Sequence, residues 1–175
     1  MSRIGIQVLL PADLEQIKQI LIDRGNFVEV EVEVAMEVCD EAAAHPFQEY
    51  YGYCAKDGDR VAGFIVFGLI PMTDRCWDLY WIAVAPDFAR AGVGLMLAES
   101  MEKIIAEMKG RQIHIDTSSL PTYLPACRFY EKIGFMLEAR LKDFYRVGDD
   151  KLIYVKELEL HRSRKAEVQD SESQG

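Results

Sequence analysis

The stretch LYWIAVAPDFARAGVGLMLAESMEKIIAEMKGRQIHID (residues 79–116) decides the fold of this chain. An apolar run ends just before Pro86, and a turn of small residues containing Gly92 and Gly94 follows it. The next segment carries an apolar face at helical spacing, and a second short apolar run then ends at Asp116. The members of the helical face are Leu97, Met101, Ile104, Ile105 and Met108. This order predicts a strand, a glycine turn, a helix over about residues 92–109 and a strand over about residues 112–117.

The N-terminal part of the chain predicts a strand followed by two helices. Alternating apolar residues indicate a strand over residues 3–10, and helical spacing after Pro11 indicates a helix that ends at Gly25. Residues 28–34 alternate valine with glutamate, which is typical of a strand. The same valines also fall on helical faces, and strong helix formers follow them. We therefore predict a helix over about residues 30–44.

Four further strands and one short helix are expected. Residues 51–55 and 60–70 flank the hairpin turn signal Asp57-Gly58-Asp59. Toward the C-terminus the pattern predicts a short helix over residues 125–133. Two last strands are expected, which are joined across Gly148-Asp149-Asp150. These two strands span residues 135–141 and 151–160.

Composition restricts the class of protein. The 175 residues carry a formal net charge of −9, with a pI near 4.9, which argues against a nucleic-acid partner because phosphate binding needs a basic surface. Four widely spaced cysteines without a ligand pattern indicate reduced thiols and no metal site. No apolar run is long enough to span a membrane, and no signal peptide is evident, so a cytoplasmic protein is expected. Residues 1–160 are expected to form a single domain, and the polar tail 161–175 is expected to be disordered.

The glycine turn between strand and helix is suited to an anion. Glycines allow a ligand to approach the backbone closely, and the unpaired N–H groups of a helix start attract phosphate. The same glycines also serve a purely structural turn, and that alternative stays open. A dinucleotide-binding fingerprint is a second alternative, because Asp116 follows Gly92 and Gly94 by about 20 residues. Leu97 occupies the position of the third glycine in that fingerprint, which argues against it.

Two motifs resemble those of the GNAT superfamily of N-acetyltransferases. The segment VAPDFARAGVG (84–94) resembles the family's acetyl-CoA pyrophosphate loop, Gln/Arg-x-x-Gly-x-Gly/Ala after a strand ending in Val-x-Pro. The segment Ala126-x-x-x-Tyr130-x-x-x-Gly134-Phe135 is similar to the family's second signature, and the two motifs have the expected order and separation. Two positions differ from the family pattern. Ala89 replaces the usual Gln or Arg, and Tyr123 replaces a common asparagine.

The resemblance implies a fold and a cofactor. The implied fold is α/β (α+β), with a mixed, mostly antiparallel central sheet of about six to seven strands, splayed in the middle and flanked by about four helices. The implied cofactor is acetyl-CoA, as a co-substrate, with a backbone N–H near residues 82–84 meeting the thioester carbonyl. Since Ala89 supplies no side-chain phosphate contact, the backbone is expected to supply more of them. The implied cofactor-binding residues are Ile82, Ala83, Val84, Ala89, Arg90, Ala91, Gly92, Val93, Gly94, Ala126 and Phe129.

The resemblance also implies an acid and a base for acetyl transfer. Tyr130 matches the tyrosine that often protonates the leaving thiolate, and a phenol with an ordinary pKa of about 10 is able to do so. Asp78 and Asp116 stand where family members place a carboxylate, and either is a candidate general base. The structural alternatives are a packed tyrosine and solvated carboxylates at strand ends. His114 is interpreted as a structural or surface residue, and Cys127 as a packing residue.

The expected function is an acyltransferase that moves an acetyl group from acetyl-CoA to a primary amine by direct transfer through a tetrahedral intermediate. The acceptor is a small molecule or a peptide or protein amine, and the acidic chain favours a cationic one. A non-catalytic acyl-CoA-binding sensor or interaction domain is the alternative, because the fold alone does not determine function. A monomer and a homodimer are both compatible with the sequence.

Overall fold

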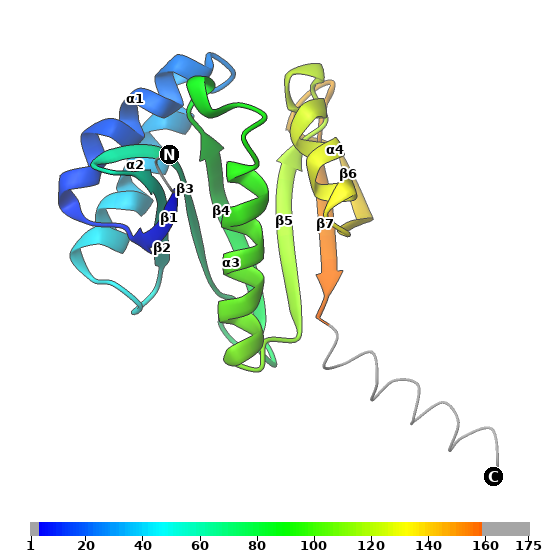
Figure 1. Cartoon of the computed structure of the whole chain (residues 1–175). Coiled ribbons are helices and arrows are strands. Elements are labelled where there is room, and N and C mark those ends of the chain that lie inside the picture. The colour runs from blue at the N-terminus through cyan, green and yellow to red at the C-terminus, as the bar shows by residue number, and fades with distance from the viewer. Residues whose placement is uncertain (1–3, 159–175) are drawn as a thin grey trace, which may run out of the picture. The chain divides into compact units, whose positions relative to one another are not determined.

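The computed structural model describes residues 4–158, whose elements follow the predicted order. The strands are β1 (Gly5–Val8), β2 (Tyr51–Asp57), β3 (Arg60–Leu69), β4 (Cys76–Val84), β5 (Gln112–Ser118), β6 (Met136–Arg146) and β7 (Asp149–Glu157). The helices are α1 (Leu14–Arg24), α2 (Glu29–Ala44), α3 (Val93–Glu107) and α4 (Leu124–Lys132) (Figure 1). Short 3-10 turns at Pro11–Asp13, Pro86–Phe88 and Pro121–Tyr123 lead toward α1, α3 and α4. The predicted polar tail lies outside the described residues.

The strands form one mixed sheet in the order β1-β2-β3-β4-β5-β7-β6, so the predicted fold class is confirmed. The pairs β1–β2, β2–β3, β5–β7 and β6–β7 are antiparallel, whereas β4 and β5 are parallel. The parallel ladder joins Cys76–Asp78 to Gln112–His114 and ends there, although both strands continue. Pairing is therefore interrupted in the middle of the sheet, as predicted.

The chain comprises two compact units. The first unit extends to Leu69 and includes Leu79–Met101, and the second contains Ile70–Asp78 and the chain from Glu102 onward. Strand β4 and helix α3 each contribute residues to both units. Among the described residues, no helix is both long and apolar enough to cross a bilayer.

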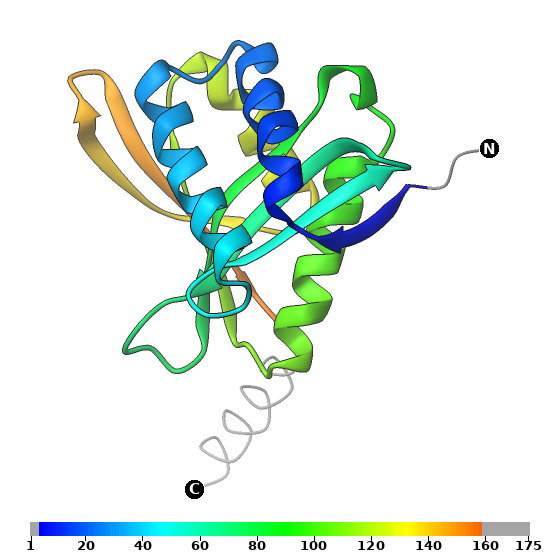
Figure 2. The same cartoon turned by 90° about the vertical axis from the view of Figure 1, so that its left-hand side faces the viewer.

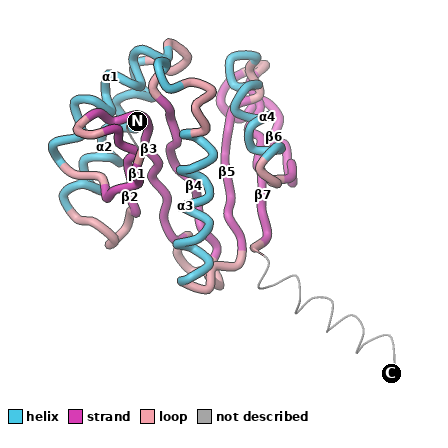
Figure 3. Tube along the Cα trace, in the orientation of Figure 1, coloured by secondary structure: helices cyan, strands magenta, loops and turns pink. Residues whose placement is uncertain are grey.

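In the first unit, α1 and α2 pack on one face of the strands β2 and β3 (Figure 3). The core between them is apolar and includes Ile17 and Leu21 of α1, Cys39 of α2, and Phe64 of β3, all fully buried. Strand β3 is buried on both faces, which explains why its sequence is an almost continuous apolar run.

Residues 29–44 form a helix, as predicted, and not the strand that their alternation also suggested. Its buried face consists of small residues, Ala35, Cys39, Ala42 and Ala43, at helical spacing. The alternating valines lie elsewhere, since Val30 is 60% and Val34 is 46% exposed. The Glu31 carboxylate accepts a hydrogen bond of 2.8 Å from the Val28 N–H, which caps the first turn.

In the second unit, the predicted turn of the last hairpin is corrected. The turn lies at residues 147–148 and not at the predicted residues 148–150. Strand β6 continues to Arg146, beyond its predicted end at residue 141 (Figure 2). Asp149 and Asp150, expected in the turn, instead begin β7 and are buried. Between Leu141 and Arg146 the register shifts, so that β6 carries extra residues in a bulge.

Two buried aspartates hold this hairpin in place. Asp150 accepts hydrogen bonds from the Asp143 N–H, at 2.8 Å, and from the Arg140 guanidinium. Asp149 accepts a hydrogen bond from the Ser118 hydroxyl, and the Asp150 N–H donates to Ser119 Oγ at 2.9 Å. The hairpin is thereby tied to the end of β5, which explains why two acidic residues are buried in a strand.

Candidate active site

The end of β4 and the start of α3 lie in the first unit and are closely packed against β3. A Cβ atom added to Gly63 of β3 would lie 2.8 Å from the Ala83 carbonyl oxygen, 3.0 Å from Val93 Cγ1 and 3.2 Å from Leu97 Cδ1. The end of β4 and the start of α3 therefore approach β3 to a distance that only glycine permits. This packing positions the backbone of residues 82–84 and the first turn of α3 relative to each other.

The turn before α3 exposes its backbone. Residues 89–92 are all exposed, and Arg90 (φ 65°) and Gly92 (φ 77°) adopt left-handed conformations. The Gly92 carbonyl accepts the hydrogen bond of the Met96 N–H at 3.0 Å, so the helix ladder begins at Gly92. The N–H groups of the next residues, Val93 and Gly94, therefore have no acceptor within the helix, and they lie at the positive end of its dipole. This geometry fits a phosphate or pyrophosphate group.

The strand that leads to the turn is held at its end. The Arg24 guanidinium donates a hydrogen bond of 3.1 Å to the Val84 carbonyl, and the Ala85 N–H donates to the Ala62 carbonyl at 2.8 Å. Ile82 and Val84 are half-buried, whereas Ala83 is buried. The predicted cofactor-binding residues of β4 and of the turn therefore belong to one continuous segment of the first unit, which is held at the end of β4 and exposed at residues 89–92.

Tyr130 lies in the second unit, in the buried face of α4, and is 8% exposed. Its ring centroid lies 5.9 Å from that of Tyr154 on β7 and 6.3 Å from that of Phe135. The Tyr154 hydroxyl donates to Glu131 Oε1 at 3.0 Å, and burial is the main factor that raises the Tyr154 pKa. Ala126 and Phe129 of the same helix are half-buried. Tyr130 is therefore both an aromatic packing residue and a phenol fixed in place.

The two candidate carboxylates lie on one face of the sheet in the second unit. Asp78 is the register partner of His114 on β5, and Asp116 is two residues farther along β5 on the same face. Asp78 is half-buried, and its pKa is raised, first by burial and then by the negative charge of Asp116. The His114 and Lys151 charges oppose this rise in pKa. The structure thus brings together the two aspartates that the sequence left as alternatives.

Lys151 is a site residue that the sequence analysis missed. Its Nζ forms an ion pair with Asp116 Oδ2 and lies 4.9 Å from the centre of the Phe144 ring. The pair depends on the antiparallel register of β5 and β7, in which Ser118 lies opposite Lys151 and Asp116 lies opposite Ile153. Residues so far apart in the chain leave no signal of such a contact in the sequence.

Tyr130 and the aspartates lie on opposite faces of the second unit's strands. Tyr130 packs on Tyr154, which is the register partner of Ile115, whereas Asp116 is the partner of Ile153. Side chains of successive strand residues point to opposite faces. The Tyr130 side chain and the two aspartates therefore lie on different sides of these strands.

The remaining chemical groups of interest are accounted for. Cys127 is buried, and burial raises the pKa of its thiol, in keeping with its interpretation as a packing residue. Within residues 4–158, no cluster of His, Cys, Asp and Glu side chains has the arrangement of a metal site.

Comparison with known proteins gives consistent results. Residues 15–135 match the family model described as Acetyltransferase (GNAT) family. A solved GNAT-family structure from Desulfovibrio desulfuricans is 37% identical with a TM-score of 0.85, and the match covers 89% of this chain and 99% of that one. No protein of curated function matches the chain.

Two more distant structures share the fold and contain coenzyme A. An aminoglycoside 6′-N-acetyltransferase complexed with coenzyme A is 20% identical, with a TM-score of 0.68, and the match covers 87% of this chain and 96% of that one. The PaiA N-acetyltransferase of Thermoplasma acidophilum, also in complex with coenzyme A, is 19% identical, with a TM-score of 0.69 and coverage of 89% and 99%.

Proposed function

Because the chain belongs to the GNAT acetyltransferase family, we propose that it transfers the acetyl group of acetyl-CoA directly to a primary amine. The observation that carries the proposal is that the family match covers the glycine turn, Asp78, Asp116 and Tyr130 together. Acetyl-CoA supplies the activated acyl group as a thioester. The remaining steps depend on the side chains and backbone of this protein.

The exposed turn and the start of α3 are proposed to hold the pyrophosphate. The N–H groups of Val93 and Gly94 and the exposed backbone of residues 89–92 supply donors, and the φ of Gly92 presents them without steric strain. Ala89 offers no side-chain donor, and Arg90 is exposed beside it. The backbone of residues 82–84 is proposed to bind the pantetheine arm and to polarise the acetyl carbonyl. Ala126 and Phe129 of α4 complete the proposed cofactor-binding set.

Asp78 is proposed as the general base. An acceptor amine that arrives as an ammonium ion must lose a proton before it attacks the thioester. Asp116 is already engaged by Lys151, whereas no described residue donates a hydrogen bond or ion pair to the Asp78 carboxylate. The raised pKa of Asp78 makes it a better proton acceptor than an ordinary surface aspartate. Asp116 then contributes negative charge that attracts a cationic amine.

Tyr130 is proposed as the general acid that protonates the leaving thiolate. In this step the phenol O–H bond breaks and an S–H bond forms on CoA, and the tyrosinate then takes up the second proton that the attacking nitrogen loses. The packing of Tyr130 against Tyr154 and Phe135 limits the positions that the phenol can take, and such restriction favours proton transfer to one defined atom.

The proposal is tested by titration calorimetry and by an acceptor screen. Acetyl-CoA is expected to bind the wild type, and a Gly94→Trp variant is expected to bind it much more weakly. The screen follows CoA release with a polyamine, an aminoglycoside and peptides with free N-termini. Tyr130→Phe is expected to retain acetyl-CoA binding and to lose most of its turnover. Binding of acetyl-CoA without turnover of any amine would support the sensor alternative instead.

A further inference from the structure

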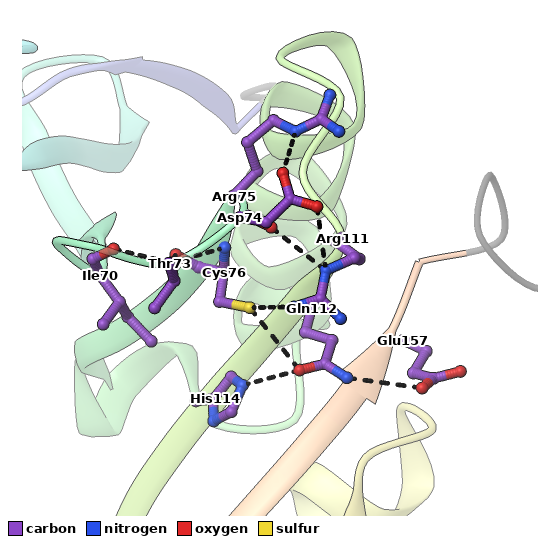
Figure 4. A network of polar contacts seen from close by, with 9 residues as sticks. All are labelled: Ile70, Thr73, Asp74, Arg75, Cys76, Arg111, Gln112, His114 and Glu157. Atoms are coloured by element: carbon purple, nitrogen blue, oxygen red, sulfur yellow. Dashed lines mark hydrogen bonds and ion pairs between the residues drawn. The ribbon is translucent and has the colours of Figure 1, made fainter.

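A chain of polar side chains crosses one face of the second unit and ends at His114. Glu157 of β7, Gln112 and His114 of β5, and Cys76 of β4 meet there (Figure 4). Gln112 Nε2 donates to Glu157 Oε1 at 3.4 Å, and His114 Nε2 lies 3.2 Å from Gln112 Oε1. The Cys76 thiol also donates to Gln112 Oε1, with an Sγ–Oε1 distance of 3.7 Å. The Arg111 guanidinium donates to Cys76 Sγ at 3.1 Å.

This chain determines which ring nitrogen of His114 carries the proton. A carboxylate only accepts hydrogen bonds, so Glu157 requires the NH₂ group of Gln112 to face it. The amide oxygen of Gln112 must then face His114, and an oxygen only accepts. His114 Nε2 is therefore the donor, and in the neutral ring Nδ1 carries the free electron pair. The tautomer of His114 is therefore determined by Glu157, which lies two hydrogen bonds away on the neighbouring strand β7.

His114 lies beside the proposed base. Asp78 is its register partner in the parallel ladder, both side chains project from the same face, and the imidazole acts on the charge of the Asp78 carboxyl. Other charged groups near this network are Arg111, which donates to Cys76 Sγ, and Glu138 of β6, which lines the same pocket as Gln112 and Glu157. Asp116 of β5 and Lys151 of β7 also lie on this face. Asp116 is paired with Lys151, and Glu157 is bonded to Gln112, so neither lies free to take a proton from Asp78.

The proposed reaction leaves one proton to be removed. An ammonium acceptor and acetyl-CoA give an amide, the thiol of CoA and one released proton. When Asp78 takes that proton, the half-buried carboxyl becomes neutral and must lose it again before the next turnover. A second group next to Asp78 that accepts this proton would therefore restore the Asp78 carboxylate in each catalytic cycle.

We propose that His114 is a positioning residue for this site, whose Nδ1 receives the proton from Asp78 and releases it to solvent water. This inference rests on the proposed acetyl transfer with Asp78 as base. In the step, the O–H bond of Asp78 breaks and an N–H bond forms at Nδ1, which leaves a carboxylate and an imidazolium ion. The imidazolium ion then loses its proton to water, and the starting state returns. Gln112 and Glu157 keep Nδ1 in the accepting state.

The tautomer is tested first, without any activity measurement. Long-range proton–nitrogen NMR of the wild type distinguishes the two ring nitrogens, and His114→Gln assigns the signals among the three histidines of the chain. We expect the Nε2–H tautomer for neutral His114 and a mixture of tautomers in Gln112→Leu. A neutral ring protonated at Nδ1 would overturn the proposal, whatever the enzyme does.

The transfer is tested by kinetics of the same variants. His114→Gln retains a donor toward Gln112 but has no titrating nitrogen. Its kcat is expected to fall on the order of 10-fold, less than the roughly 10²–10⁴-fold loss for a direct acid or base. The KM for acetyl-CoA should not change. In His114→Ala, added imidazole is expected to restore part of the lost kcat, which a purely structural role would not allow.

The matched control is His45→Gln. His45 is an exposed histidine of the first unit that contacts Glu41 Oε1 at 2.8 Å, and its replacement is expected to leave kcat unchanged. If the wild type acetylates an amine and His114→Gln has the wild-type kcat, the role of His114 is refuted while the proposed function stands. If the wild type acetylates no amine, the proposed function fails, and the role of His114 fails with it.

Discussion

The Nζ of Lys151 forms an ion pair with Asp116, and this contact distinguishes the two aspartates of the site. Asp116 is paired with an ammonium group and its side chain remains 45% exposed, whereas Asp78 is half-buried with a raised pKa. Two carboxylates close together whose environments differ in this way are commonly divided between two tasks. The division predicts different outcomes when each aspartate is replaced.

Replacing Asp78 is expected to affect turnover far more than replacing Asp116. Asp78→Asn removes the proposed base and should lower kcat by roughly 10²–10⁴-fold. Asp116→Asn should mainly raise the KM of a cationic amine, because it removes an attractive charge but no proton transfer. Steady-state kinetics of CoA release, with acetyl-CoA saturating, measures both values. Equal losses of kcat in the two variants would contradict this division of roles.

Removing Lys151 is expected to shift the acid limb of the pH–rate profile upward. Asp78 must be ionised to act as a base, so kcat/KM falls as the pH drops through its pKa. The Lys151 charge lowers that pKa, and without it the uncompensated charge of Asp116 raises it further. In Lys151→Met the acid limb should therefore lie at a higher pH than in the wild type. Lys142→Met, an exposed lysine of the same hairpin, is the control and should leave the limb in place.

Gly63→Ala is expected to lower both stability and acetyl-CoA affinity. The added methyl group would meet the Ala83 carbonyl at 2.8 Å and Val93 at 3.0 Å, and overpacking of this kind costs about 1–3 kcal/mol of unfolding free energy. The affected backbone belongs to the proposed cofactor-binding strand, so calorimetry should show weaker binding. Gly5→Ala, where an added Cβ meets nothing within 4 Å, is the matched control for denaturation. Equal unfolding free energies of Gly63→Ala and Gly5→Ala would show that the close approach to β3 does not exclude a side chain at position 63.

Asp150 is expected to make the free energy of unfolding decrease as the pH falls into the acid range. The Asp143 N–H and the Arg140 guanidinium hold the pKa of its carboxyl below the ordinary value. A lowered pKa in the folded protein means that the stabilisation is present above the unfolded pKa and is lost as the pH falls through the folded pKa. The difference in unfolding free energy between wild type and Asp150→Asn should therefore be larger at pH 7 than at pH 3. Denaturant titrations at both pH values measure it, and a constant difference would refute the expectation.

The sequence predicted most elements because local signals and tertiary packing agree there. Gly25, at φ 68°, ends α1 as its position suggested, and the Asp57–Asp59 signal joins β2 to β3. The helix α2 was harder to predict, because its alternating valines do not form the buried face. Its small residues do, and alanine and cysteine give a weak periodic signal.

The last hairpin shows why turn residues alone were misleading. Gly148-Asp149-Asp150 has the composition of a turn, yet the two aspartates are buried and bonded to residues outside the turn, Asp149 to Ser118 on β5 and Asp150 to Arg140 on β6. The same limit applies to the site. Asp78, Asp116 and Tyr130 were candidates from their motif positions, whereas Lys151 depends on strand register. His114 was interpreted as a structural or surface residue because it points opposite to its isoleucine neighbours, and strand β5 by itself does not reveal the register partner Asp78 on β4.

The four free cysteines, Cys39, Cys54, Cys76 and Cys127, are all buried. Burial raises the pKa of Cys39 to about 12 and raises the pKa values of Cys54 and Cys127 as well, so these thiols hardly form the reactive thiolate. A colour reagent for thiols should therefore detect CoA released in a reaction with almost no background from the folded protein. The same reagent would report loss of the native structure, because unfolding exposes four new thiols per chain.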